Sequence, residues 1–238
     1  MKVNKDLFGH ALGQFYFKKD SAKLYSESNI SHWDEYPLTH LFRDFDQMPE
    51  IERNAMSLVH GKILDVGCGA GSHSLYLQDL GHDVRSIDCS KGATQVAQAR
   101  GVTQVREASL MDYDEERFDT IIMLMNGTGI FESIDRVPTY LNKLKTLLNP
   151  KGMVLIDSSD LNYMYDTGQD ESIWVPADRY YGELEFRLRY KKNLSEKFPW
   201  LFIDKHLFIH LAESNGWSIE IVFEGAHYDY LAKLMPQQ

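Results

Sequence analysis

Residues 62–71 read KILDVGCGAG, and this stretch decides the fold class. The apolar run at 62–66 predicts a buried strand, and the helical spacing at 72–80 predicts a helix directly after the glycines. Glycines between a strand and a helix let backbone N–H groups approach a ligand without an intervening Cβ. In parallel α/β sheets, ligands bind at the carboxyl ends of the strands. The stretch therefore predicts the first strand of an α/β fold, followed by a ligand-binding loop.

The same alternation of strand and helix continues on the carboxyl side. Strands are expected at 83–87, 102–107, 118–125 and 153–157, and helices at 92–100 and 137–148. Such repeated alternation requires a parallel sheet with right-handed crossovers and helices on both faces. Two further strands, 218–223 and 228–234, follow a helix at 205–215 and are joined by too short a connection for a parallel crossover. The predicted fold is α/β: a doubly wound, Rossmann-like, mostly parallel seven-stranded sheet that ends in an antiparallel strand pair.

The rest of the chain is expected to cover this sheet. Residues 1–60 are rich in aromatic side chains and are predicted to form an N-terminal helical cap or lid, before a main domain at 61–238. Within that domain, 160–204 breaks the rhythm and is predicted to be an inserted lid. Its segments 185–191 and 198–203 alternate or run apolar at strand length, which predicts an inserted β-hairpin.

Composition excludes several classes of protein. The 238 residues carry 35 Asp and Glu against 25 Lys and Arg, a formal net charge of −10. That charge repels polyphosphate, so no nucleic-acid partner is expected. No run of 18 apolar residues and no signal-peptide pattern occur, so no membrane partner is expected. Two cysteines cannot form a disulfide framework, which favours a cytoplasmic location. The oligomeric state is left open.

Two carboxylates beside the glycines indicate the kind of ligand. Asp65 lies at the tip of the first predicted strand, where an anion favours a cation such as an amino-acid ammonium. Asp88 ends the second strand, where a carboxylate can accept hydrogen bonds from the hydroxyls of an adenosine ribose. The dinucleotide fingerprint places its third glycine five residues after the first, whereas Gly71 comes four after Gly67. An NAD-dependent oxidoreductase is therefore the alternative that the spacing disfavours.

Four motifs together resemble the class I S-adenosylmethionine-dependent methyltransferases. They are LDVGCGAG at 64–71, Asp88 after the second strand, FDTIIMLMN at 118–126 and LLNPKGMVLID at 147–157. The resemblance implies that the glycines line the methionine and ribose of S-adenosylmethionine and that Asp65 lies near its ammonium. It also implies that Asp88 holds the ribose hydroxyls and that S-adenosylhomocysteine is the product.

The predicted adenine site departs from this family. Many relatives carry Asp where Ser109 stands, so the backbone N–H of Leu110 is the expected contact to the adenine ring, and Asp112 can substitute for the missing carboxylate. Cys68 and Cys89 lie in the two cofactor loops, and their thiols are expected to be small, buried and without a redox role.

The expected acceptor site is less well marked. Asn126 begins NGTG at the end of the fourth strand, and we expect it either to orient the acceptor or to belong to a plain turn. YPLTHLFR at 36–43 resembles the lid of small-molecule methyltransferases, with Tyr36 and Arg43 reaching the methionine carboxylate or the substrate. A surface ion pair of Arg43 with Asp44 or Asp46 is the alternative. No metal site is expected, and candidate general bases are His32, Tyr36, His227 and Tyr230.

The predicted function is transfer of a methyl group from S-adenosylmethionine, by in-line displacement, to an O, N or C atom of a small molecule. The alternatives are the oxidoreductase and a non-catalytic S-adenosylmethionine-binding protein. The predicted catalytic residues are Asn126 and Tyr36, and the predicted cofactor-binding residues are Asp65, Gly67, Cys68, Gly69, Gly71, Asp88, Cys89, Ser109, Leu110, Asn126 and Arg43.

Overall fold

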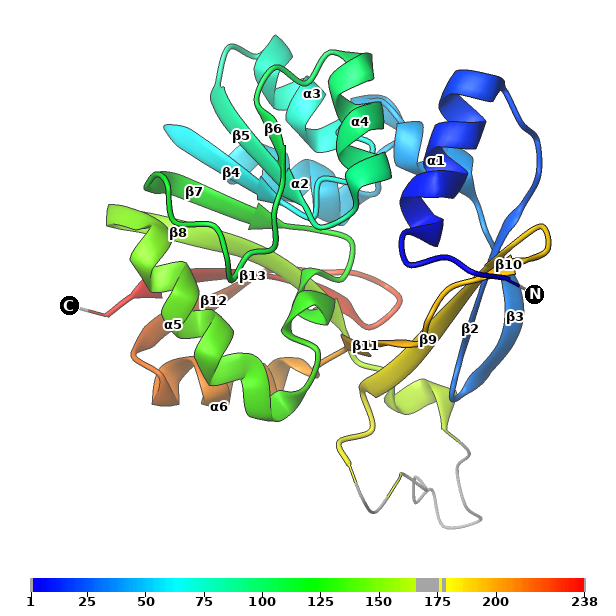
Figure 1. Cartoon of the computed structure of the whole chain (residues 1–238). Coiled ribbons are helices and arrows are strands. Elements are labelled where there is room, and N and C mark those ends of the chain that lie inside the picture. Colours follow the sequence, from blue (N-terminus) through cyan, green and yellow to red (C-terminus); the bar gives the residue numbers. More distant parts are fainter. Residues whose placement is uncertain (1, 166–175, 177–178, 238) are drawn as a thin grey trace.

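The computed structural model, which describes residues 2–165, 176 and 179–237, contains two β-sheets that lie side by side (Figure 1). The larger sheet has seven strands in the order β12-β13-β8-β7-β4-β5-β6. Its strands from β4 through β8 pair in parallel, and β13 is antiparallel to both β8 and β12. The predicted doubly wound sheet with a terminal antiparallel pair is therefore confirmed. The strand bounds are β4 Lys62–Val66, β5 Asp83–Asp88, β6 Val105–Glu107, β7 Phe118–Met123, β8 Leu148–Ser159, β12 Trp217–Glu224 and β13 Asp229–Pro236.

Helices cover both faces of this sheet, because successive side chains of its inner strands point to opposite sides. Ile122 of β7 packs in the core under α2 (Glu50–Leu58) and α3 (Ser72–Asp79). Its neighbour Ile121 packs in the core under α5 (Val137–Leu147) and α6 (Lys205–Ser214). The order of strands reverses direction beside β4, which places the glycine loop at the switch point where ligands bind in such sheets.

The smaller sheet joins the N-terminal segment to the predicted insertion. Its β9 pairs with β11, which confirms the expected hairpin, but β9 also pairs with β2 instead of with the seven-stranded sheet. The bounds are β1 Lys2–Val3, β2 Leu24–Ser28, β3 Ser31–Tyr36, β9 Glu183–Tyr190, β10 Asn193–Leu194 and β11 Phe198–Leu201.

The N-terminal segment is only partly helical. The expectation of helices is correct for α1 (Leu7–Lys18) and wrong for residues 24–36, which form β2 and β3. Leu24 is fully buried opposite Tyr190 of β9, a partner far away in the sequence that local spacing does not reveal. The short helices η1 (Leu38–Phe42) and η2 (Phe45–Gln47) then lead into α2. The domain boundary at residues 60 and 61 stays a prediction, and residues 166–175 and 177–178 of the predicted insertion lie outside the described residues.

The remaining helices are α4 (Lys91–Arg100), η3 (Gly127–Phe131), η4 (Ile134–Arg136) and η5 (Asn162–Met164). Figure 1 shows α1 alongside α4. Among the described residues, no helix has the length and apolar character needed to cross a membrane.

Candidate active site

The three glycines of the loop between β4 and α3 have different tasks. Gly67, Gly69 and Gly71 have φ angles of 76°, 55° and 82°, in the left-handed region that favours glycine. A Cβ on Gly71 would lie 2.5 Å from the Val102 side chain, so Gly71 allows the loop to pack closely. A Cβ on Gly69 would meet no atom within 4 Å, although the residue is buried. Gly69 therefore borders space that a ligand can enter.

Asp88, the last residue of β5, points its carboxylate at this loop. Its Oδ2 accepts a hydrogen bond from the backbone N–H of Gly69 at 2.8 Å, and its Oδ1 accepts one from Ser90 at 2.8 Å. Burial, together with the nearby charges of Asp65 and Asp6, raises the pKa of Asp88 to about 6, while the two N–H groups oppose that rise. The carboxyl is therefore mostly ionised at pH 7, and each oxygen keeps a lone pair for a further donor.

Asp65 lies behind the loop. Its carboxylate is buried and accepts a hydrogen bond from the Ser74 hydroxyl, which also bonds the Ser86 hydroxyl at 2.8 Å. Burial raises the pKa of Asp65. This interaction fixes the first turn of α3 against β4, and the contact of Asp65 with a ligand ammonium stays a prediction.

The loop after β6 pairs the two polar residues of the predicted adenine site. The Ser109 hydroxyl donates to Asp112 Oδ2 at 2.6 Å, and the side chain of Leu110 is buried beside them. Ser109 therefore orients an exposed carboxylate three residues away. This arrangement supports Asp112 as the substitute acceptor for an adenine amino group.

The two thiols have different surroundings. Cys68 is buried and Cys89 is exposed, so the expectation that both are buried is wrong for Cys89. Cys89 follows the last residue of β5, whereas the backbone N–H of Cys68 donates to the Ile87 carbonyl at 3.1 Å. Burial raises the pKa of the Cys68 thiol well above its ordinary value, which leaves that thiol protonated and unreactive.

The end of β7 carries a strained turn that Asp157 of β8 holds. Met125 and Asn126 have φ angles of 68° and 60°, which costs free energy at non-glycine residues. Asp157 accepts from the backbone N–H of Met125 at 3.1 Å and of Gly127 at 2.8 Å, on separate oxygens. The Ser159 hydroxyl donates to Asn126 Oδ1 at 2.9 Å. Asn126 thus ends a turn and caps the short helix η3, and this arrangement also holds the Asn126 side chain in one orientation. The sequence reasoning missed Asp157, although its place at the end of the fifth strand was a signal.

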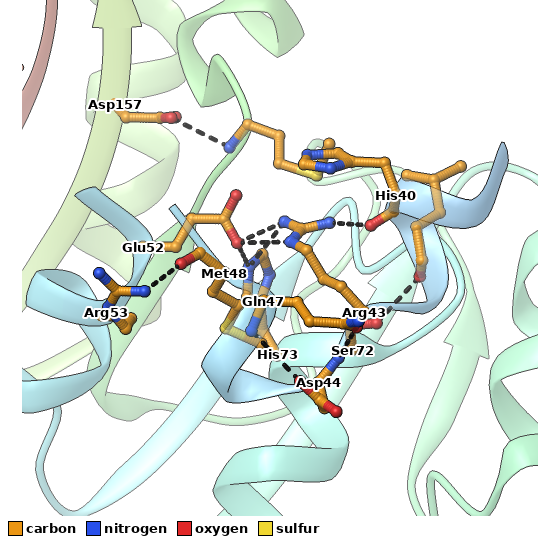
Figure 2. Close-up of polar contacts among 12 residues, drawn as sticks. His40, Arg43, Asp44, Gln47, Met48, Glu52, Arg53, Ser72, His73 and Asp157 are labelled. Atoms are coloured by element: carbon orange, nitrogen blue, oxygen red, sulfur yellow. Dashed lines mark hydrogen bonds and ion pairs between the residues drawn. The ribbon is translucent and has the colours of Figure 1, made fainter. Parts of the chain in front are cut away.

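Arg43 lies in a buried ion cluster with Glu52 and His73 (Figure 2). Arg43 is 4% exposed and Glu52 is 3% exposed. The guanidinium donates to Glu52 Oε2 through Nε at 3.1 Å and through Nη2, and its Nη1 donates to the backbone oxygen of His40. Glu52 Oε2 also lies 2.7 Å from His73 Nε2. The alternative of a surface ion pair with Asp44 or Asp46 is wrong, because Glu52 takes the guanidinium and Asp44 instead caps η2.

The structure separates the candidate general bases. His32 and His227 are exposed, while the buried Tyr230 hydroxyl donates to the Ile203 carbonyl at 2.8 Å. Burial raises the pKa of Tyr36, which packs edge-on against Phe8. His40 of η1, which the sequence reasoning missed, is half-buried, and burial followed by the Arg43 charge lowers its pKa. The neutral imidazole of His40 is therefore favoured near pH 7.

The described part of the chain holds no group of three or more His, Cys, Asp or Glu residues arranged to bind a metal ion.

Comparison with known proteins agrees with this geometry. A family model described as a methyltransferase domain matches residues 64–156. The chain is 40% identical to a SAM-dependent methyltransferase from Bacteroides fragilis whose crystal structure is in complex with S-adenosyl-L-homocysteine, with a TM-score of 0.92, and the match covers 100% of this chain and 98% of that one.

Curated relatives match over a shorter part. A probable S-adenosyl-L-methionine-dependent methyltransferase TehB from Haemophilus influenzae is 27% identical over 68% of this chain and 54% of its own length. A ubiquinone biosynthesis O-methyltransferase from Rhodopseudomonas palustris is 33% identical over 48% of this chain and 47% of its own. The chain thus spans about half the length of these curated relatives.

Proposed function

The chain belongs to the family of S-adenosylmethionine-dependent methyltransferases, and we propose that it transfers a methyl group from S-adenosylmethionine to a small molecule by in-line displacement. The observation that carries the proposal is the Asp88 carboxylate, which is held between the N–H groups of Gly69 and Ser90 beside the open space at Gly69. One relative is named as an O-methyltransferase of ubiquinone biosynthesis, and this name supports a small-molecule acceptor.

The residues present fit this cofactor. Asp88 would accept from the ribose hydroxyls, while the backbone of Gly67 and Gly69 would border the ribose and methionine. Leu110 and Asp112 would hold the adenine. When bound, the cofactor supplies an electrophilic methyl group on a sulfonium, so the protein's main tasks are alignment and exclusion of water.

The N-terminal segment is fixed over the glycine loop, as water exclusion requires. Arg100 at the end of α4 donates to the carbonyl of Ala70 in the loop at 2.6 Å and to that of Phe42 in η1 at 3.4 Å. Its guanidinium also stacks on the Phe42 ring, 5.0 Å from the centroid. Ser72 adds a hydrogen bond to the Leu41 carbonyl at 2.9 Å. These contacts support the proposal that residues 36–43 roof the site, and roles for Tyr36 and Arg43 toward a ligand stay predictions.

The direct test of this function is calorimetric titration with S-adenosylhomocysteine. We expect saturable binding that NADH does not displace. Absence of binding at millimolar concentration would contradict the proposal, and competition by NADH would favour the oxidoreductase. Release of S-adenosylhomocysteine during an acceptor screen would distinguish an enzyme from a non-catalytic binding protein.

Gly69→Ala is expected to weaken S-adenosylhomocysteine binding about 10-fold, because the new methyl group enters the proposed ligand space at a left-handed φ. Gly81→Ala is the matched control, since Gly81 also has a positive φ of 87° and also has no atom within 4 Å of a built Cβ. Both variants should lose similar stability in thermal unfolding. Equal affinity of the two variants for S-adenosylhomocysteine would show that Gly69 does not border the cofactor.

Asn126→Gly is expected to lower kcat/KM for the acceptor about 10-fold and to weaken S-adenosylhomocysteine binding by a smaller factor. Glycine keeps the left-handed backbone of Asn126 and removes only the amide that Ser159 orients. Steady-state kinetics with the identified acceptor provide the measurement. An unchanged kcat/KM would show that the Asn126 side chain does not orient the acceptor.

A further inference from the structure

We propose that Asp6, just before α1, is a positioning residue for the Asp88 carboxylate, so that docking of the N-terminal helix and binding of the cofactor are coupled. The inference rests on the proposed function, because it assumes that Asp88 holds the ribose. Among the described residues, α1 makes no hydrogen bond to the glycine loop itself. Its docking would therefore affect cofactor binding indirectly, through Asp6.

A chain of hydrogen bonds links Asp6 to the glycine loop. Asp6 Oδ1 accepts from the Ser90 hydroxyl at 2.7 Å. The backbone N–H of Ser90 donates to Asp88 Oδ1 at 2.8 Å, and Asp88 Oδ2 accepts from Gly69 at 2.8 Å. One residue, Ser90, therefore joins the two carboxylates.

Asp6 also caps two helices at once. Its Oδ1 accepts from Gly9 in the first turn of α1 at 3.0 Å, and its Oδ2 accepts from Gly92 in the first turn of α4 at 2.9 Å. Ser90 is the N-cap of α4 and accepts from Ala93 at 3.0 Å. A carboxylate at two helix N-termini is well placed for the positive ends of their dipoles. Asp6 thereby sets the position of Ser90, and Ser90 sets the position of Asp88.

These contacts exist only when α1 is docked. A Cβ on Gly92 would lie 2.4 Å from the backbone carbonyl carbon of Gly9, and a Cβ on Gly9 would lie 2.3 Å from the Ser90 hydroxyl. The two helices thus touch through glycine backbone, side by side as Figure 1 shows. If α1 moves away, Ser90 loses its acceptor and Asp88 loses its fixed neighbour. Reciprocity of binding free energies then requires that a ligand on Asp88 stabilise the docked helix.

Charge gives a second route from Asp6 to Asp88. The groups that face the Asp88 carboxyl are Asp65 at the end of β4, Asp6, and the thiols of Cys68 and Cys89. Burial and, to a smaller extent, the negative charges of Asp65 and Asp6 raise the pKa of Asp88, and the N–H groups of Ser90 and Gly69 lower it. Removal of the Asp6 charge should therefore move the titration of Asp88 to lower pH.

The test measures the Kd of the full-length protein for S-adenosylhomocysteine from pH 5 to pH 8 by calorimetry. Asp6→Asn should weaken binding about 5-fold at pH 7.5, because an amide cannot accept from both Ser90 and Gly92 as the carboxylate does. The loss of affinity on acidification, which we attribute to protonation of Asp88, should also occur at lower pH in Asp6→Asn than in the wild type. In an Asp88→Asn background, the effect of Asp6→Asn should disappear. Asp20→Asn, which loses the ion pair with Lys191 at the other end of α1, is the control and should leave binding unchanged.

The outcomes separate the two proposals. If the wild-type protein does not bind S-adenosylhomocysteine, the proposed function fails. If it binds and Asp6→Asn binds equally well with the same loss of affinity on acidification, or if Asp6→Asn and Asp88→Asn are additive, only the positioning role is overturned. Should Asp6→Asn not fold, amide hydrogen exchange of the wild-type protein decides: S-adenosylhomocysteine should slow exchange in residues 7–18, and unchanged exchange there would overturn the coupling.

Discussion

Asp88→Ala is expected to weaken S-adenosylhomocysteine binding at least about 100-fold at pH 7.5, because two charge-assisted hydrogen bonds from the ribose are lost together. The substitution also leaves the N–H groups of Gly69 and Ser90 without their acceptor, so the loop itself loses its orientation. Calorimetric titration measures the effect. Asp83→Ala is the control, since Asp83 is an exposed residue at the opposite end of the same strand. A Kd of Asp88→Ala within a few-fold of the wild-type value would show that Asp88 does not bind the ribose.

The same carboxylate predicts an acid limit for binding. The pKa of Asp88 is raised to about 6, and the ionised form is the stronger acceptor. Affinity should therefore be constant above pH 7 and fall by up to about tenfold per pH unit below 6, as the carboxyl takes up a proton. The Asp88→Asn variant should bind S-adenosylhomocysteine weakly, and its affinity should not fall further below pH 6. A wild-type affinity that stays constant from pH 8 to pH 5 would contradict the assignment.

The seven-stranded sheet could be predicted because each of its central strands carries its own local signal. Strand β7 is buried on both faces, so its sequence is a continuous apolar run, and β4 begins directly after Gly61, which has a left-handed φ of 62°. Asp88 could be predicted for the same reason, since the end of a recognisable strand beside a glycine loop is a defined place in the fold.

The smaller sheet could not be predicted in this way. Strands β2 and β3 read LYSES and SHWDEY, mostly polar sequences that have no strong local preference. Their stability depends on β9, where Leu24 lies opposite Tyr190. Pairing across so long a separation is decided by tertiary packing, and the aromatic residues of the segment alone suggested helices.

The polar contacts of the site show the same limit. Asp6 and Ser90 are ordinary capping residues in sequence, and their contact spans 84 positions. Glu52 was different, because a local signal existed. It lies on α2 next to Ile51 and one turn before Met56, both buried, so helical periodicity places it on the inner face. A buried carboxylate requires a cation or hydrogen-bond donors as partners, and for Glu52 the cation is Arg43.

Glu52→Gln is expected to lower the free energy of unfolding by about 3 to 5 kcal/mol at pH 7, because Arg43 then remains buried without a counter-ion. The neutral amide keeps the volume of the side chain, so packing around α2 is little changed. His73 also loses the negative charge 2.7 Å from its Nε2. Urea unfolding followed by circular dichroism measures the change.

Glu50→Gln is the matched control for this prediction. Glu50 and Glu52 both lie in the first turn of α2 and interact alike with the helix dipole, but Glu50 is exposed. Its substitution should cost no more than about 1 kcal/mol. Equal losses for the two variants would mean that the helix dipole, and not the buried cluster, explains the effect of Glu52.

The dependence of the Glu52 effect on pH follows from the direction of its pKa. Burial acts to raise the pKa of Glu52, but contacts with His73 and Arg43 together outweigh burial and lower that pKa below its ordinary value of 4.5. A carboxyl whose pKa is lower in the folded state stabilises the protein above its unfolded pKa, and that stabilisation is lost as the pH falls through the folded pKa. The difference between wild type and Glu52→Gln should therefore be full at pH 6 to 7 and shrink below about pH 4.5. A difference that stayed constant into that acid range would show that Glu52 acts through its shape and not through its charge.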